Sequence, residues 1–298
     1  MKTYDIAILT AKKFYNHLNP DWYVKQVLQE DNILLTTLQK KGLNAVRTYW
    51  DNPDFDFEDT KITLFRTIWD YFHRFDEFSV WLKNTENNTR LMNPPELLYW
   101  NIDKHYLNDL SAKGINIPPT IFVEKGEHKN LNRLFLDSKF KDAILKPAIS
   151  GAGRHTYKLS EANFGEYDQI FKQLIENEAM LLQEYQYNIT KYGEIAIILF
   201  NGKYSHSVLK TAKPGDFRVQ DDFGGTVQLH NPTQEEIDFA EKAISACSTL
   251  PLYARVDIMR DNHDEPVLGE LELIEPELWF RFHPPAAESL ADAIKAML

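Results

Sequence analysis

Acidic residues near the end of the chain have a spacing that could hold a metal ion. Residues two apart on a strand share a face, so Glu270 and Glu272 are expected to point the same way. If Arg260 pairs with Val267 in a hairpin, Asp257 falls opposite Glu270, with Cβ atoms about 5 Å apart. Three converging carboxylates require a counter-charge, and their oxygens suit a hard cation such as Mg²⁺. A solvated acidic sheet face with basic partners is the alternative interpretation.

A second candidate is a lysine followed by a Gly-containing loop. Lys146 ends an apolar segment, and Gly151 and Gly153 follow it. Glycines let backbone N–H groups approach phosphates, and the lysine supplies positive charge. The segment is not a P-loop, because Gly-Lys-Ser/Thr is absent, and Thr156 breaks the dinucleotide fingerprint. A phosphate cradle and a plain Gly-rich turn therefore both remain open.

Other catalytic templates are absent from the sequence. It contains no Gly-x-Ser-x-Gly elbow, no His-Glu-x-x-His motif and no histidines at metal-ligand spacing. The single cysteine, Cys247, lies on the apolar stripe of a predicted helix, which favours a core position over a nucleophile. One cysteine excludes an intramolecular disulfide and favours a reducing compartment.

Composition is that of an ordinary globular protein. The 298 residues are 43% hydrophobic and 26% charged, with a formal net charge of −11, which disfavours disorder and suggests about two domains. The acidic balance disfavours nucleic acid and anionic membranes as partners. No secretory signal is recognised at the start, and no apolar run approaches the roughly 20 residues of a membrane span. We therefore expect a soluble, cytoplasmic protein.

The spacing of apolar residues predicts the strands and helices that position these side chains. Strands at 4–9, 43–48 and 62–65, with a helix over 24–41 between the first two, predict a small parallel sheet. Ligands bind beyond the carboxyl ends of such strands, so the loops 10–13 and 66–71 are candidate substrate surfaces. Further strands are expected at 120–123, 143–146, 181–185, 194–200, 204–210, 255–260 and 267–274. Further helices are expected from an N-cap at Asn101, over 162–177, from the Thr233–Glu236 capping box to 248, and over 286–298. The Asn201-Gly202 pair predicts a hairpin turn.

Taken together, these pieces resemble the ATP-grasp superfamily, in particular the glutathione-synthetase-like and ribosomal-S6-modification-like ligases. The N-terminal Arg66-x-x-Trp69-Asp-Tyr71 motif and the Glu-Leu-Ile-Glu-Pro276 segment resemble the branch that includes the D-cycloserine-forming cyclase of O-ureidoserine. The resemblance is carried in chain order by Asn101–Lys104, Leu145–Pro147 with its loop, Leu182–Tyr185, Gly193-Glu194, Phe217–Val219 before Gly224-Gly225, Val256-Asp257 and Glu270–Glu272. It implies an α/β fold of the α+β ATP-grasp type. A pre-ATP-grasp parallel-sheet domain at 1–95 would precede two α+β subdomains, 96–186 and 187–298, that clamp a nucleotide.

The resemblance also implies roles for individual residues. Asp257, Glu270 and Glu272 would hold Mg²⁺, with two ions or Mn²⁺ as variants, although many relatives carry Asn at the last position. The nucleotide would be bound by Lys104, Lys146, Ser150, Gly151, Gly153, Arg154, Gln183, Glu184, Tyr185 and Glu194. Arg218 would act on the transferring phosphoryl group, and Lys210 would contact phosphate or end a solvated strand. The substrate would meet Arg66, Trp69, Asp70, Tyr71 and Arg281, for which interdomain packing is the alternative.

The implied activity is ATP-dependent ligation of a carboxylate to an amine, or to a thiol, through an acyl phosphate. An intramolecular cyclase of an amino-acid derivative and a non-catalytic nucleotide-binding module are the alternatives. The implied partners are small-molecule carboxylate and amine substrates, and a homo-oligomer is left open.

Overall fold

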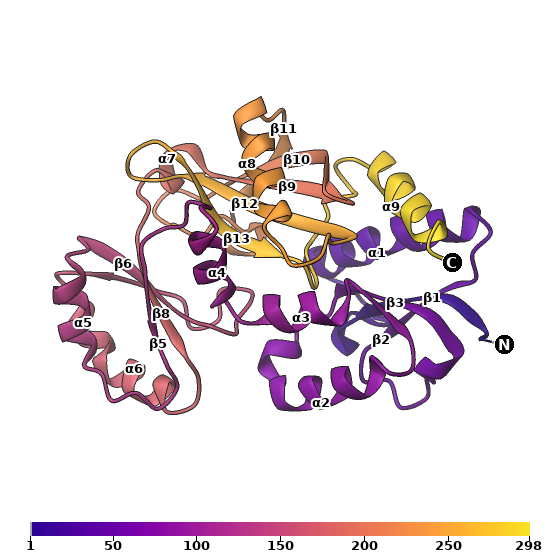
Figure 1. Cartoon of the computed structure of the whole chain (residues 1–298), viewed down its shortest axis with the longest axis horizontal. Helices are drawn as coiled ribbons and strands as arrows, with labels where there is room; N and C mark the ends of the chain where they lie inside the picture. Colours follow the sequence, from indigo (N-terminus) through magenta and orange to yellow (C-terminus); the bar gives the residue numbers. More distant parts are fainter. Residues whose placement is uncertain (1) are drawn as a thin grey trace.

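Three β-sheets organise the chain in the computed structural model, which describes residues 2–298. Figure 1 shows the N-terminal sheet at the lower right, the second sheet at the left and the third sheet above and between them. Each sheet comes from one continuous part of the chain. This arrangement confirms the expected α/β class, with a parallel N-terminal sheet followed by two α+β parts.

The N-terminal sheet is parallel, and its strand order is β2-β1-β3-β4. Its elements are β1 (Tyr4–Thr10), α1 (Trp22–Lys40), β2 (Ala45–Tyr49), β3 (Thr60–Thr67), α2 (Phe75–Thr85) and β4 (Arg90–Met92). The strands of such a sheet are covered on both faces, which explains why Ile6–Leu9 are fully buried. The predicted strand–helix–strand start is confirmed. The last helix and strand, α2 and β4, were not predicted, because β4 is only three residues long.

The second sheet has the order β5-β8-β6-β7, and its neighbouring strands are antiparallel. Its elements are β5 (Thr120–Val123), α5 (Leu131–Ser138), β6 (Asp142–Pro147), β7 (Tyr157–Ser160), α6 (Asp168–Ile175) and β8 (Met180–Glu184). The helix expected over 162–177 is shorter, since residues 164–167 form a 3₁₀ turn ahead of α6. Lys146 lies at the end of β6, opposite Leu181.

The third sheet is antiparallel with the order β11-β10-β9-β12-β13. Its elements are α7 (Ile189–Tyr192), β9 (Glu194–Phe200), β10 (Lys203–Thr211), β11 (Thr226–His230), α8 (Gln234–Ser245), β12 (Tyr253–Arg260) and β13 (Pro266–Glu272). The predicted hairpin turn is confirmed: Asn201 and Gly202 have φ values of 48° and 73°, as a two-residue Asn-Gly turn requires. The Thr233–Glu236 capping box is also present at the start of α8.

The pairing of β12 with β13 differs from the predicted register at one end. Arg260 lies opposite Pro266, so the expected Arg260–Val267 pairing is wrong by one residue. At a bulge between Ile258 and Asp257, Gly269 of β13 has no partner residue on β12, and the register shifts by one. Asp257 is therefore opposite Glu270, as predicted, although the premise for that prediction was wrong.

Two short helices between the first and second sheets, α3 (Pro95–Ile102) and α4 (Tyr106–Ala112), support the outer edge of β13. The Asn101 amide donates to the Leu271 carbonyl at 2.8 Å and accepts from the Leu273 amide at 2.8 Å. The Tyr106 hydroxyl accepts from the Leu271 amide at 2.9 Å. The expected N-cap role of Asn101 is therefore wrong. Asn101 lies inside α3, and its side chain replaces a missing neighbouring strand.

The closing helix α9 (Pro285–Lys295) returns to the N-terminal part of the chain and lies beside α1 (Figure 1). Leu290 and Ile294 of α9 share a buried cluster with Leu34 of α1 and Ile198 of the third sheet. The first and last parts of the chain therefore share one core. No helix within residues 2–298 is long and apolar enough to cross a membrane.

Candidate functional site

A cavity of about 400 Å³ lies where the three sheets meet. Side chains from the loops after β3 and from β6, β9, β10, β12 and β13 line it. Fourteen of the residues predicted for the site are in its wall: Trp69, Tyr71, Lys104, Lys146, Ser150, Gly151, Gly153, Gln183, Glu194, Lys210, Arg218, Asp257, Glu270 and Glu272. The fold thus brings together residues that are up to about 200 positions apart in the chain.

The three predicted metal ligands share this cavity, and each is paired with a cation. Asp257 Oδ2 lies 2.9 Å from Arg255 Nη2. Glu270 Oε1 lies 2.9 Å from Lys104 Nζ, and Glu272 pairs with the same Arg255. Within residues 2–298, no group of three His, Cys, Asp or Glu side chains has metal-holding geometry. The basic partners anticipated by the alternative interpretation are therefore present, although Asp257 is buried rather than solvated.

Lys210 lies at the bottom of this network. It is 3% exposed, and its Nζ lies 2.5 Å from Glu194 and 3.0 Å from Asp257. Burial alone lowers a lysine pKa, but the charges of Asp257 and Glu194 outweigh it and leave the pKa of Lys210 raised. Lys210 is therefore a buried cation between two carboxylates, and the prediction of a solvated strand end is wrong.

Two further lysines face the cavity from the second sheet and its entry segment. Lys104 Nζ donates to the Ser150 carbonyl at 2.6 Å, which ties the Gly-containing loop to Glu270 through one side chain. Burial is the main cause that lowers the pKa of Lys146 to about 8. The charge of Glu270 opposes this shift, and the nearby charge of Lys104 contributes to it. This site therefore has an unused cation at Lys146, for which no ion pair occurs within residues 2–298.

The loop after Lys146 needs its glycines for two different reasons. A Cβ on Gly151 would lie 2.7 Å from the ring of Phe72, so the loop approaches the N-terminal domain too closely for a side chain. Gly153 has a φ of +66°, in the left-handed region that favours glycine. Arg154, in contrast, is outside the cavity wall and pairs with Glu178, with Nη1 to Oε1 at 3.0 Å.

The three consecutive residues predicted to bind the nucleotide, Gln183, Glu184 and Tyr185, do not all face the cavity. Glu184 and Tyr185 are outside the cavity wall, whereas Gln183 is in it. The Tyr185 amide donates to the Asp142 carbonyl at 3.0 Å. That amide is therefore occupied by the strand ladder, and it does not offer a free donor to a nucleotide base.

The Arg66–Tyr71 motif acts mainly on the segment that follows β13. Arg66 is fully buried and its Nη1 donates to the Pro276 carbonyl at 2.8 Å. Trp69 Nε1 donates to the Glu275 carbonyl at 3.0 Å. Asp70 accepts from Trp50 Nε1 at 2.9 Å, outside the cavity wall. Packing between the first and last parts of the chain therefore accounts for Arg66, and packing within the N-terminal domain accounts for Asp70, while Trp69 and Tyr71 also line the cavity.

Arg281 is likewise a packing residue in this structure. Its guanidinium pairs with Glu30 of α1 at 3.1 Å, with Asp221 at 3.1 Å and with Glu277. It is outside the cavity wall. Arg281 thus ties three distant segments together.

Arg218 lies on the segment between β10 and β11, at the rim of the cavity. Its Nη2 lies 2.8 Å from Asp216 Oδ2, and its guanidinium stacks 4.0 Å from the centre of the Phe223 ring. The Arg218 side chain is 35% exposed. It is therefore held in place and remains accessible from the cavity.

Several cavity residues were not predicted as site residues. They are Lys13, Tyr23, Phe72, Asp221, Asp222, Arg255, Met259, Glu275, Glu277 and Trp279. Lys13 lies in a loop that follows a strand end, and Glu275 lies in the quoted Glu-Leu-Ile-Glu-Pro276 ending, so both carried a signal. Tyr23 and Trp279 carried none, because only tertiary packing brings them to the cavity.

The three carboxylates repel one another within the cavity. Burial is the main cause that raises the pKa of Glu272 to about 8; Arg255 opposes the shift, and the charges of Glu270 and Asp257 add to it. A divalent cation would relieve this repulsion, and the donors are oxygens of the kind that hard cations bind. The donor types therefore suit a divalent metal, although the three side chains are paired with cations and are not gathered around one point.

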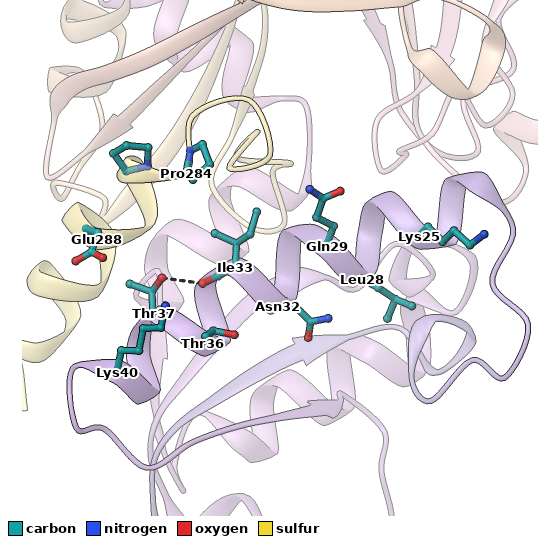
Figure 2. A pocket seen from close by; sticks show the side chains of 11 residues that line it. Lys25, Leu28, Gln29, Asn32, Ile33, Thr36, Thr37, Lys40, Pro284 and Glu288 are labelled. Carbon is teal, nitrogen blue, oxygen red and sulfur yellow. Dashed lines mark hydrogen bonds between the residues drawn. The ribbon is translucent and has the colours of Figure 1, made fainter.

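A separate open groove runs along α1 and the start of α9 (Figure 2). It is lined by Lys25, Gln29, Ile33, Lys40, Pro284, Glu288 and their neighbours. None of the predicted site residues lies in it. The groove is thus unrelated to the converging charges of the cavity.

Comparison with known proteins places the chain in a family. Residues 113–262, just over half of the chain, match the family described as prokaryotic glutathione synthetase, ATP-grasp domain. Residues 6–93 match the N-terminal domain of D-cycloserine synthetase DcsG. The cycloserine biosynthesis protein DcsG of Streptomyces lavendulae is 27% identical over 285 residues, which cover 89% of this chain and 92% of that protein.

Solved structures show the same fold. The crystal structure of D-cycloserine synthetase DcsG matches with a TM-score of 0.86 and 24% identity, over 98% of this chain and 99% of that one. The D-alanine–D-alanine ligase of Bacillus anthracis matches with a TM-score of 0.67 and 16% identity, over 98% and 96% of the two chains.

Proposed function

Because this chain belongs to the ATP-grasp family of the prokaryotic glutathione synthetase type, we propose that its cavity binds ATP with Mg²⁺ and activates a small carboxylate as an acyl phosphate. Family membership supports ATP-dependent carboxylate–amine ligation with a divalent metal as the activity. The identity of the metal and the roles of individual residues are our proposals. One observation carries them: the acids Asp257, Glu270 and Glu272 share one cavity with Lys104 and Lys146.

The phosphates are assigned to the cations of the cavity. Lys146 has no ion-pair partner within residues 2–298 and is therefore available to a phosphate oxygen. Lys104 already links Glu270 to the Gly-containing loop, so it can bind phosphate while holding both. The loop from Ser150 to Gly153 closes over the phosphates, and Gln183 contacts the base.

The carboxylates would hold the metal. Asp257, Glu270 and Glu272 present only oxygen donors to one cavity. When bound there, Mg²⁺ would neutralise phosphate charge. Arg255 and Lys210 keep Asp257 ionised and oriented, because each contacts its carboxylate directly.

The reaction proceeds in two balanced steps. A substrate carboxylate oxygen attacks the γ-phosphorus, the bond to the β-phosphate oxygen breaks, and ADP leaves. The amine nitrogen then attacks the acyl carbon, the carbon–oxygen bond to phosphate breaks, and the nitrogen loses a proton. Arg218 at the rim stabilises charge on the phosphoryl group in both steps. Closure of the cavity excludes water, which would otherwise hydrolyse the acyl phosphate.

An intramolecular cyclase is the second candidate. It is favoured by the similarity to the cycloserine protein DcsG, which extends over the N-terminal domain as well as the nucleotide-binding part. In that case the amine and the carboxylate belong to one molecule, and the chemistry in the cavity is unchanged.

The proposed division of the chain into 1–95, 96–186 and 187–298 has one sheet in each part. Helix α9 of the last part packs against α1 of the first part.

Phosphate release in the presence of Mg²⁺ and ATP tests the proposal. The wild-type protein is incubated with a library of carboxylates and amines. The products of the reactions that release phosphate are then identified by mass spectrometry. A product that joins two substrates identifies a ligase, and a product that has lost water from one substrate identifies a cyclase. A thermal shift with Mg²⁺ and ATP but no stimulated phosphate release would favour a non-catalytic module. No thermal shift would contradict nucleotide binding altogether.

A further inference from the structure

One end of the cavity has a chemical character different from the phosphate end. Tyr23 of α1, Trp69 and Tyr71 after β3, and Trp279 after β13 provide aromatic surface there. Trp279 is 3% exposed, and its indole Nε1 has no hydrogen-bond partner. Glu275 lies on the same segment and also lines the cavity. A ligand here meets aromatic side chains and a carboxylate.

Glu275 is rigidly placed. Its own carbonyl accepts from Trp69 Nε1 at 3.0 Å, and the next carbonyl, of Pro276, accepts from Arg66 Nη1 at 2.8 Å. Tyr71 and Glu275 both line the cavity. The backbone that directly follows the Glu275 side chain is thus fixed by the N-terminal domain.

Glu275 also differs from the other acids of its segment in lacking a cation. Glu270 pairs with Lys104, Glu272 with Arg255 and Glu277 with Arg281. Among residues 2–298, no Lys, Arg or His nitrogen lies within 4.0 Å of the Glu275 carboxylate. Burial raises its pKa to about 7, although the more distant charge of Lys104 opposes the shift.

We propose that Glu275 binds the ammonium group of the substrate, within a subsite walled by Trp69, Tyr71 and Trp279. The aromatic faces favour a cation electrostatically, and the carboxylate accepts its N–H groups. This proposal rests on the proposed function, since it names the amine-bearing substrate class for the same cavity.

Binding of matched small probes tests the proposal. The probes are glycinamide and both enantiomers of alaninamide and serinamide. Each carries an ammonium group and no carboxylate, and its N-acetyl derivative is neutral. Each is titrated by saturation-transfer NMR into the protein with Mg²⁺ and the non-hydrolysable nucleotide AMP-PNP. The wild-type protein should bind at least one amine and reject its acetylated form.

The variant Glu275→Gln should weaken binding of that amine about tenfold or more, which corresponds to about 1.4 kcal/mol. Affinity for AMP-PNP should not change. Glu161→Gln, on an exposed turn, is the control and should leave both affinities unchanged. If Glu275→Gln fails to fold, Glu275→Asp retains the charge and should bind the amine more weakly than wild type but still reject the acetylated form.

Two results would overturn the subsite. One is a wild-type protein that binds no amine, or binds amines and acetylated forms alike. The other is a folded Glu275→Gln protein with wild-type amine affinity. Failure of the proposed function would be seen separately, because the wild-type protein would then not bind AMP-PNP.

Discussion

Asp257 and Glu270 occupy directly opposed positions on β12 and β13, because the bulge at Gly269 shifts the register by one residue just before them. The same bulge keeps Leu268 and Leu271 on the core side although they are three residues apart. Both acids therefore face the cavity while the apolar residues on either side stay buried. The opposed pair is the geometric basis of the proposed metal site.

Replacing Glu270 tests this basis. Glu270→Gln keeps the shape of the side chain but removes the charge that pairs with Lys104. We expect turnover to fall on the order of 10²–10³-fold, because a preorganised charge at the reacting centre is lost. Divalent-metal-dependent nucleotide affinity should also fall, with an unchanged circular dichroism spectrum. Wild-type phosphate release by this variant would count against the assignment.

Lys210 should matter for folding as well as for activity. Lys210→Met leaves Glu194 and Asp257 buried with one cation fewer, and breaking a buried ion pair costs about 3–5 kcal/mol. Chemical denaturation should show a loss of that size. Lys210→Arg, which keeps the charge, should recover part of the stability. A Met variant as stable as the wild type would show that the ion-pair network is not formed in solution.

Nucleotide affinity should depend on pH through Lys146. Burial lowers the pKa of this lysine to about 8, so it is a cation below that pH and becomes neutral above it. The Kd for AMP-PNP with Mg²⁺ should be constant from about pH 6.5 to 7.5 and then rise, approaching tenfold per pH unit. Lys146→Arg stays charged, and Glu272 titrates in both proteins, so above pH 8 the Kd of the wild type should rise relative to that of the variant in the same calorimetric titration. Parallel profiles for both proteins would remove Lys146 from the phosphate site.

The edge of β13 predicts a stability effect at Asn101. Asn101→Leu leaves the Leu271 carbonyl and the Leu273 amide buried without partners, at about 1–3 kcal/mol each. Asn101→Asp still accepts from the Leu273 amide and serves as the graded control. Urea denaturation should rank wild type above Asp and Asp above Leu. Equal stabilities would mean that water replaces the side chain.

The sequence revealed those parts of the site that depend on local periodicity. The alternation of charged and apolar residues placed Glu270 and Glu272 on one face, and the Gly-containing loop after Lys146 was recognised from its composition. Leu268 and Leu271 with a glycine between them carried the signal of a bulge, which the simple register argument overlooked.

Other contacts involve partners that local sequence patterns do not reveal. Asn101 was interpreted as a cap because its true partner, β13, lies 170 positions further on. Arg154, predicted to bind the nucleotide, pairs with Glu178. Arg281, predicted to contact the substrate or to pack between domains, pairs with Glu30 of α1. In each case a charged or polar side chain has a partner that only tertiary packing supplies.

The most direct test of the metal-nucleotide site is anomalous diffraction from crystals grown with Mn²⁺ and AMP-PNP. Mn²⁺ replaces Mg²⁺ at oxygen sites and gives an anomalous signal. The account predicts a peak among the carboxylates of Asp257, Glu270 and Glu272, next to nucleotide phosphates that contact Lys146. A bound nucleotide with no manganese at these carboxylates, or with its phosphates away from Lys146, would contradict it.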